Sequence, residues 1–242
     1  MDIAETLGGT FYKNLLSQQA RTYYDEIYAN LIRREYSGVI LFKAPLMGAA
    51  DEVFSAYKAF KDDHPECFWL GGESELCQYG RVGVLKYPVL YSPNQIERVN
   101  CLLNKQLTAF VRGTANLQMI KCERVIYKRI ANRLTYANHW DARDHNIVGP
   151  GLTGSGVCEG YTALLLLSLR RAGIPCIKIY GSSKNVHHCW VIVWIDEIPY
   201  HCDVTWDSCC SSRHLHYLNL SDRQISMDHS DFKRYGIPHC RT

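Results

Sequence analysis

Apolar and polar residues alternate along the 242-residue chain with two periods, and each period predicts one kind of element. Apolar residues recur at helical spacing over residues 12–32 and again over residues 53–60. Residues 82–91 are rich in β-branched and aromatic side chains, which predicts one or two short strands. The first third of the chain is therefore predicted to be mainly helical.

The chain after residue 91 has a clearer pattern. A long helix is predicted to follow residue 91, with an apolar stripe of the kind that packs into a core. The stripe consists of Cys122, Ile126, Ile130 and Leu134. A compact helix is predicted over residues 158–172, because Gly173 and Pro175 follow it as helix-ending residues. Strands are predicted over residues 174–180, 188–195 and 200–206.

These elements predict an α+β fold in which a helix packs on an antiparallel sheet. We expect two regions in the chain. Residues 1–115 form a mainly helical region that shapes a substrate groove, and residues 116–242 form the core that carries the chemistry. A chain of this length can bury a sizeable core in such an arrangement.

Composition narrows the class of protein. The chain is 47% apolar and 21% charged with a formal charge of +3, and no basic segment with interleaved aromatics points to nucleic acid. No basic segment followed by an apolar one resembles a secretory signal, and the longest apolar block covers only residues 163–169. We expect a cytoplasmic protein without membrane contact. The oligomeric state stays open.

Cysteine is abundant, with 11 residues and no C-x-x-C pair. In a reducing compartment most of these thiols are expected to be free and buried. A zinc ribbon is not indicated, and no calcium-loop motif occurs, so we expect neither a metal nor another cofactor.

One cysteine, Cys158, stands where a thiol would be activated. It begins the predicted helix directly after the glycine-rich stretch that contains Gly154 and Gly156. Unpaired backbone N–H groups and the positive end of the helix dipole favour an anion there, and a thiolate is an anion. The same N–H groups could stabilise a developing oxyanion. The alternative is a packed core thiol.

A histidine and an aspartate in the predicted hairpin complete a chemically sufficient set. If the turn is centred on residues 196–197, paired positions sum to about 393 and Asp203 lies opposite Trp190. His188 is then a diagonal neighbour of Asp203 on the same face, where a carboxylate can orient an imidazole base. A register slip of one residue would separate the pair. Taken alone, each residue could equally be structural.

Other residues offer rival interpretations. His187 is an alternative base, but strand alternation directs it to the opposite face from His188. A metal site would have to gather four histidines whose spacing matches no common motif. These are His187, His201, His214 and His216. The neighbouring Cys209 and Cys210 are expected to be incidental.

Three short segments also match a known family. They are Gly156-Val157-Cys158-Glu159-Gly160-Tyr161, His188-Cys189-Trp190 and Tyr200-His201-Cys202-Asp203-Val204-Thr205-Trp206-Asp207. Together they resemble the core motifs of the transglutaminase-like superfamily, in particular bacterial transglutaminase-like cysteine peptidases and acyltransferases. The likeness is strong over residues 150–230 and weaker before residue 115.

The resemblance implies a papain-like core with Cys158 as nucleophile, His188 as base and Asp203 as orienting acid. It also implies an oxyanion donor upstream of the nucleophile, for which Tyr136 and Trp140 are candidates.

Gly156 and Trp190 complete the candidate substrate-binding set. The chain departs from the family pattern at Cys189, where relatives usually carry a small residue, and carries Cys202 beside the acid.

The leading hypothesis is a cysteine acyl-transfer enzyme that acts on peptide or protein amides through a thioester, either as a protease or amidase or as a transglutaminase. Two alternatives remain open. The fold could serve as a non-catalytic protein-binding module, or the enzyme could form amides from a carrier-bound thioester. Labelling of Cys158 by a thiol reagent would distinguish the non-catalytic alternative.

Overall fold

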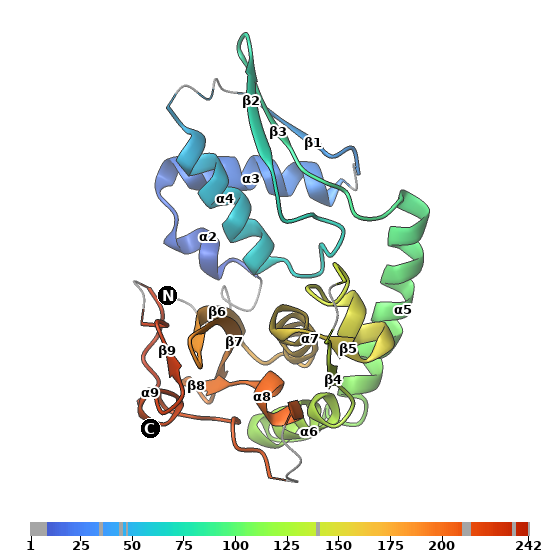
Figure 1. Cartoon of the computed structure of the whole chain (residues 1–242), viewed down its shortest axis with the longest axis vertical. Helices are drawn as coiled ribbons and strands as arrows, with labels where there is room; N and C mark the ends of the chain where they lie inside the picture. The colour runs from blue at the N-terminus through green and yellow to red at the C-terminus, as the bar shows by residue number, and fades with distance from the viewer. Residues whose placement is uncertain are drawn as a thin grey trace. The chain divides into compact units, whose positions relative to one another are not determined.

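The computed structural model describes residues 9–33, 36–43, 46, 48–138, 141–209, 214–233 and 236–241. The chain divides into two compact units, one formed by Gly9–Asn100 and one that contains Cys101–Thr242. In Figure 1 the first unit is blue to green and the second is green to red. Helix α5, Pro93–Val111, runs across the division between them. The mixture of helices and antiparallel sheets confirms the predicted α+β class.

The first unit combines helices with a small sheet. Its other helices are α2 (Phe11–Leu15), α3 (Gln18–Ile32) and α4 (Ala50–Asp63). Its strands are β1 (Val39–Phe42), β2 (Glu75–Tyr79) and β3 (Val82–Lys86), in the antiparallel order β1-β3-β2. Strand β3 confirms a strand within residues 82–91, whereas β1 and β2 are additional to the sequence prediction.

The helical run predicted over residues 12–32 is two helices rather than one. The chain breaks at Ser17, whose hydroxyl accepts the N–H of Ala20 at 3.1 Å and so caps α3. Helix α2 receives its cap from a distant residue, because the carboxylate of Asp63 accepts the N–H groups of Tyr12 and Lys13, each at 3.0 Å. These caps satisfy backbone donors that the first turn of a helix leaves unpaired.

The second unit carries the larger sheet. Its helices are α6 (Met119–Ala131), α7 (Cys158–Arg171), α8 (Val204–Cys209), α9 (Asp222–Ile225) and the π-helical turn η1 (Gly149–Thr153). Its strands are β4 (Thr135–Tyr136), β5 (Ser155–Gly156), β6 (Cys176–Ser183), β7 (Val186–Ile195), β8 (Ile198–Cys202) and β9 (His229–Ser230). The four-stranded sheet has the antiparallel order β8-β7-β6-β9, and β4 pairs with β5 in parallel.

Helices α6 and α7 pack around the core of this unit. All four residues of the predicted apolar stripe are buried, and three of them lie on α6. The single long helix predicted after residue 91 is wrong in detail, because a turn with Gly113 at a φ of +76° separates α5 from α6. Helix α7 begins at the predicted residue and ends one residue before the predicted end, with Ala172 as its C-cap and Gly173 at a φ of +77°.

The β7–β8 hairpin has the predicted register, since Val191 pairs with Cys202 and Trp194 with Pro199. The last strand, however, is shorter than predicted. It ends at Cys202, and α8 begins at Val204.

The physical reason is a cap formed by Asp203. Its Oδ1 accepts the N–H of Thr205 at 2.9 Å and that of Trp206 at 3.3 Å. This local pairing outweighs the strand propensity of the β-branched and aromatic residues that follow. Among the described residues, no helix has the length and apolar content needed to cross a bilayer.

Candidate active site

Cys158 is the first residue of α7. Val157 is the N-cap residue of α7, and its backbone is extended. Its side chain makes no capping hydrogen bond, so it leaves the first-turn N–H groups of α7 open to another acceptor. The thiol is partly exposed. Cys158 thus begins the helix predicted from the sequence, at a position where the helix end would favour an anionic sulfur.

The glycines around Cys158 are required by packing of the preceding loop. A Cβ on Gly160 would lie 2.4 Å from the backbone oxygen of Asp144, and a Cβ on Gly156 would lie 3.0 Å from Cδ of Pro150. Gly154 has a φ of +78°, in the left-handed region that favours glycine. The N–H of Val157 also donates to the backbone oxygen of Asp144 in this loop, at 3.0 Å. The glycines thus fix the entry of the chain into α7.

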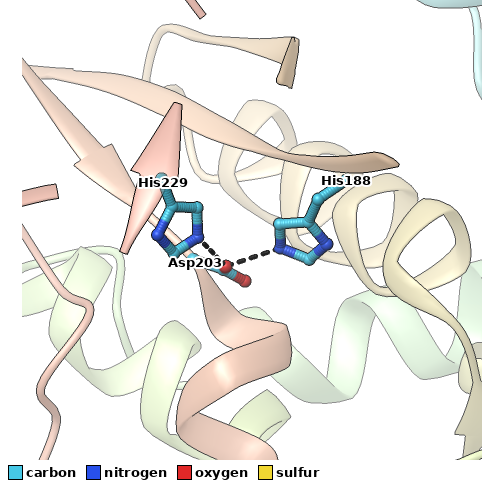
Figure 2. A group of neighbouring side chains, drawn as sticks. All are labelled: His188, Asp203 and His229. Atoms are coloured by element: carbon cyan, nitrogen blue, oxygen red, sulfur yellow. Dashed lines mark hydrogen bonds and ion pairs between the residues drawn. The ribbon is translucent and has the colours of Figure 1, made fainter. Parts of the chain in front are cut away.

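His188 and Asp203 form a buried pair. Nε2 of His188 lies 2.7 Å from Oδ2 of Asp203, and the two side chains are 9% and 1% exposed (Figure 2). His188 comes from β7 and Asp203 directly follows β8, so the hairpin register brings them together. The ring of Trp190 stacks on His188 with centroids 5.7 Å apart. Because Nε2 of His188 is hydrogen-bonded to Asp203, Nδ1 is the ring nitrogen of His188 that is available to the Cys158 thiol.

Asp203 is fixed through both oxygens. Its Oδ1 caps α8, and its Oδ2 also contacts Nε2 of His229 at 3.0 Å. Burial alone would raise the pKa of this carboxyl, but the hydrogen bonds from His188 and His229 more than offset it and lower the pKa. The carboxylate therefore stays ionised beside the imidazole.

The Cys158 thiol and the His188 imidazole favour the charged form of each other. A hydrogen bond from the Cys189 side chain is the largest cause that lowers the pKa of Cys158, burial opposes it, and the bond and charge of His188 add to the lowering, to about 5. Burial opposes protonation of His188, but hydrogen bonds to Asp203 and Cys158 raise its pKa to about 9. Between these values the pair is a thiolate beside an imidazolium.

His187, the rival base, lies elsewhere. It is exposed, its Nδ1 lies 3.0 Å from the carbonyl oxygen of Gly181, and its ring stacks on Tyr180 with centroids 5.9 Å apart. Strand alternation separates it from His188 as predicted.

The four candidates for oxyanion stabilisation and substrate binding lie in different surroundings. Tyr136 on β4 is 48% exposed, and burial followed by the nearby Cys158 thiolate raises the pKa of its phenol, which keeps the O–H as a donor. Gly156 lies on β5, which pairs with β4. Trp140 lies outside the described residues. Trp190 is only 1% exposed and its indole N–H donates to Nδ1 of His201 at 3.0 Å, so we assign it to packing beneath His188.

The four histidines that a metal site would have had to gather do not come together in the described part of the chain, as the mismatch of their spacing indicated. His201 is buried and bonds to Trp190 and Asp222, while His187 bonds to a backbone carbonyl. Among the described residues, two other groups have donor atoms close enough to share a cation. They are His188, Asp203 and His229, and His201, Asp222 and Cys240.

In both groups the nitrogen atoms are already engaged in hydrogen bonds. The indole of Trp190 donates to Nδ1 of His201, which places the His201 hydrogen on Nε2 and directs it to Asp222. A metal at Nε2 would require that hydrogen to move to Nδ1, opposite another donor. In the group around Asp203, both histidines would have to release an N–H hydrogen before binding a metal.

Sequence reasoning missed two residues near the sulfur and the acid. Cys189 was noted in the sequence only as a departure from the family pattern, yet its side chain contacts Thr162, one turn after Cys158 on α7, at 3.6 Å between Sγ and Oγ1. His229 lies 26 residues after Asp203, in a segment without periodicity. Neither carries a spacing signal that would have identified it.

Comparison with known proteins supports the resemblance. Residues 106–204 match the model of the transglutaminase-like superfamily, which confirms the resemblance over this segment. The match contains Cys158, His188 and Asp203 and ends at the first residue of α8. A search of curated proteins found no relative of the chain.

Solved structures with partial similarity include a TGase with 14% sequence identity and a TM-score of 0.39. This alignment covers 79% of this chain and 57% of the TGase chain. Another is a candidate cysteine protease from Cytophaga hutchinsonii, at 13% identity, a TM-score of 0.38, 55% of this chain and 61% of the other. The periplasmic domain of TgpA from Pseudomonas aeruginosa, bound to ethylmercury, has 18% identity, a TM-score of 0.31, 54% of this chain and 59% of the other. The chain thus spans about three fifths of the length of these proteins, and at these scores they add no support to the assignment.

Proposed function

We propose that this chain, whose residues 106–204 match the transglutaminase-like superfamily, is a cysteine acyl-transfer enzyme that acts on peptide or protein amides. The observation that carries the proposal is the joint placement of Cys158 at the start of α7 and the buried His188–Asp203 pair on the adjoining hairpin. Each of these features has a structural explanation when taken alone. Their convergence on one sulfur favours catalysis.

The first step would form a thioester. The Cys158 thiolate attacks the carbonyl carbon of the amide, and the carbonyl oxygen becomes an oxyanion. As the C–N bond breaks, the His188 imidazolium gives its proton to the departing amine nitrogen. The products of this step are a free amine, an acyl group bound to Cys158 and a neutral His188.

The second step would release the acyl group. Neutral His188 takes a proton from water or from an incoming primary amine, whose oxygen or nitrogen attacks the thioester carbonyl. Water yields a carboxylic acid and an amine yields a new amide, and in both cases the Cys158 thiolate and the imidazolium are restored. Asp203 stabilises the imidazolium whenever His188 carries the second proton.

Two kinds of donor could stabilise the oxyanion. The uncapped N–H groups in the first turn of α7 lie beside the sulfur, and an oxyanion near them would gain from the helix dipole. Tyr136 supplies a protonated hydroxyl close to Cys158. We assign it as the side-chain donor among the described residues.

A library of peptide amides tests the proposal. Wild type and Cys158→Ala would be compared, with Cys101→Ala as the matched control because Cys101 is an exposed thiol on α5. We expect amide turnover by wild type and the control, and a loss of at least about 1,000-fold in Cys158→Ala. Equal turnover by all three proteins would refute the role of Cys158 as the nucleophile.

Single-turnover reactions with and without an added primary amine would separate hydrolysis from transfer. An amide of the added amine among the products indicates a transferase. An unchanged product distribution indicates a protease or amidase, because water then accepts the acyl group alone.

A further inference from the structure

A second histidine, His229, contacts the same oxygen of Asp203 that His188 contacts (Figure 2). Its Nε2 lies 3.0 Å from Oδ2, compared with 2.7 Å for Nε2 of His188. The two imidazoles come from different strands, β9 and β7, and their centroids are 5.5 Å apart. A cysteine, histidine and aspartate set does not require this fourth side chain.

His229 is held firmly in this position. Its residue pairs with Ser183 across the β6–β9 ladder, and its side chain is fully buried. The ring meets Trp190 edge to face with centroids 4.8 Å apart, and Trp206 lies on another side at 5.9 Å. The ring therefore cannot turn away from Asp203 without disturbing its aromatic neighbours.

Both nitrogens of His229 face carboxylate oxygens. Nδ1 lies 2.5 Å from Oδ1 of Asp228, whose Oδ2 lies 2.5 Å from the hydroxyl of Tyr217. A ring between two carboxylates is either an imidazolium or the partner of one protonated carboxyl group. With Asp203 ionised, each of these states leaves a hydrogen on Nε2 directed at Oδ2 of Asp203.

The consequence for Asp203 is a complete set of donors. Two backbone N–H groups bind Oδ1 and two imidazoles bind Oδ2. During the proposed reaction His188 alternates between charged and neutral forms, so its bond to Asp203 changes in strength. The bond from His229 does not depend on the reacting proton.

We propose that His229 is a positioning residue that keeps Asp203 ionised and aimed at His188 while the charge of His188 changes. This inference rests on the proposed function, because it gives His229 a part in the same reaction. His229 acts through Asp203 and touches neither the sulfur nor the acyl group.

The charged and titratable groups that face His229 and Asp203 come from several elements. His188 is on β7, His201 is on β8, Asp228 precedes β9, and Tyr217 lies in the segment before α9. Tyr127 on α6 also lies close enough to sense the charge of Asp203. Any pH dependence assigned to His229 has to be measured against these neighbours.

Two substitutions at one position separate hydrogen bonding from packing. His229→Phe keeps a ring among the aromatic side chains and removes both donors, whereas His229→Gln can return one N–H to the place of Nε2. His239→Gln is the matched control, because His239 is an exposed histidine of the same C-terminal segment. Circular dichroism would verify that each variant is folded.

The measurement is the rate of Cys158 alkylation by iodoacetamide from about pH 4 to about pH 10, followed by peptide mapping. Without the His229 donor, Asp203 binds a proton more readily and stabilises the His188 imidazolium less, so the thiolate forms at higher pH. We expect His229→Phe to raise the midpoint of Cys158 ionisation by at least about half a pH unit, which is about a threefold change in the ratio of thiolate to thiol. The midpoint of His229→Gln should lie nearer to the wild-type midpoint, and the midpoint of the His239→Gln control should equal the wild-type midpoint.

The outcomes distinguish this inference from the proposed function. If wild-type Cys158 has no acidic midpoint, the proposed function fails whatever His229 does. If wild type has one that depends on His188, and His229→Phe has the wild-type midpoint or a lower one, only the role of His229 is overturned.

Nitrogen NMR of labelled histidine in wild type gives a second readout, independent of the folding of any variant. A protonated Nε2 on His229 is expected, and an unprotonated one would overturn the inference.

Discussion

Replacing His188 by glutamine should return the Cys158 thiol toward its ordinary acidity. In the wild type the pKa of Cys158 is lowered from 9.0 to about 5, through the Cys189 hydrogen bond and through the bond and charge of His188, against the effect of burial. Glutamine keeps a polar side chain at the position but carries no charge. The substitution therefore isolates the contribution of the imidazolium.

The magnitude follows from Coulomb's law. A thiolate and an imidazolium about 4 Å apart attract each other by about 4 kcal/mol at an effective dielectric constant of about 20. This energy corresponds to about 3 pH units. Part of it is lost to solvent at the partly exposed sulfur, so we expect His188→Gln to raise the midpoint by about 2 to 3 units. At about pH 6 the wild-type thiol would be about nine-tenths ionised, and the variant thiol only a few per cent.

Thiolate absorbance in the ultraviolet measures this directly, as the difference between each protein and its Cys158→Ala counterpart. The difference is needed because the chain has 11 cysteines. Burial is a cause that raises the pKa of five of the other described thiols, which therefore do not ionise in the acidic range. These are Cys67, Cys176, Cys189, Cys202 and Cys240.

His187→Gln is the control for the same assay, because His187 is the exposed neighbour in the same strand. It should leave the midpoint of Cys158 unchanged. A wild-type midpoint in the ordinary thiol range would refute the ion pair. An acidic midpoint that survives His188→Gln would show that the imidazolium is not its cause.

Three further substitutions test other parts of the account. Cys189→Ala removes the largest single cause of the lowered pKa of Cys158 and should raise the midpoint by at least about one pH unit, although the backbone N–H of residue 189 remains; an unchanged midpoint would contradict this cause. Burial raises the pKa of Glu123 to about 7. The unfolded chain then ionises first, so wild-type stability should fall by about 3 kcal/mol between about pH 4.5 and about pH 7. Denaturant unfolding at several pH values should show this fall in wild type and not in Glu123→Gln. If the unfolding free energies of the two proteins change in parallel with pH, the pKa of Glu123 is not raised in the folded protein. Gly160→Ala places a Cβ 2.4 Å from the backbone oxygen of Asp144 and should lower the free energy of unfolding by about 2 kcal/mol; an unchanged melting temperature would show that the loop can move.

The parts of the site that could be predicted from the sequence depend on local patterns. Helix α7 begins after the glycine-rich stretch and ends before Gly173 and Pro175, as their positions indicate. The β7–β8 register follows from a short turn at Asp196 and Glu197, both with positive φ. Those two features place Cys158 on one element and His188 beside Asp203 on another. Periodicity and turn chemistry act over short stretches, which is why a single sequence carries them.

The parts that could not be predicted depend on contacts between distant segments. His229 reaches Asp203 because β9, a strand of two residues, pairs with the end of β6. No period can be read from two residues. Strand propensity similarly misassigned Thr205 and Trp206, since the cap from Asp203 decides their conformation.

Trapping the acyl-enzyme tests the central claim most directly. Wild type would be mixed with an amide substrate from the peptide library, quenched with acid during the first turnover and analysed by intact mass and peptide mapping. The account predicts an added mass equal to the acyl part of the substrate, located on Cys158, present also in Cys101→Ala and absent from Cys158→Ala. Amide turnover by Cys158→Ala at the wild-type rate, or an adduct on a different residue, would contradict it.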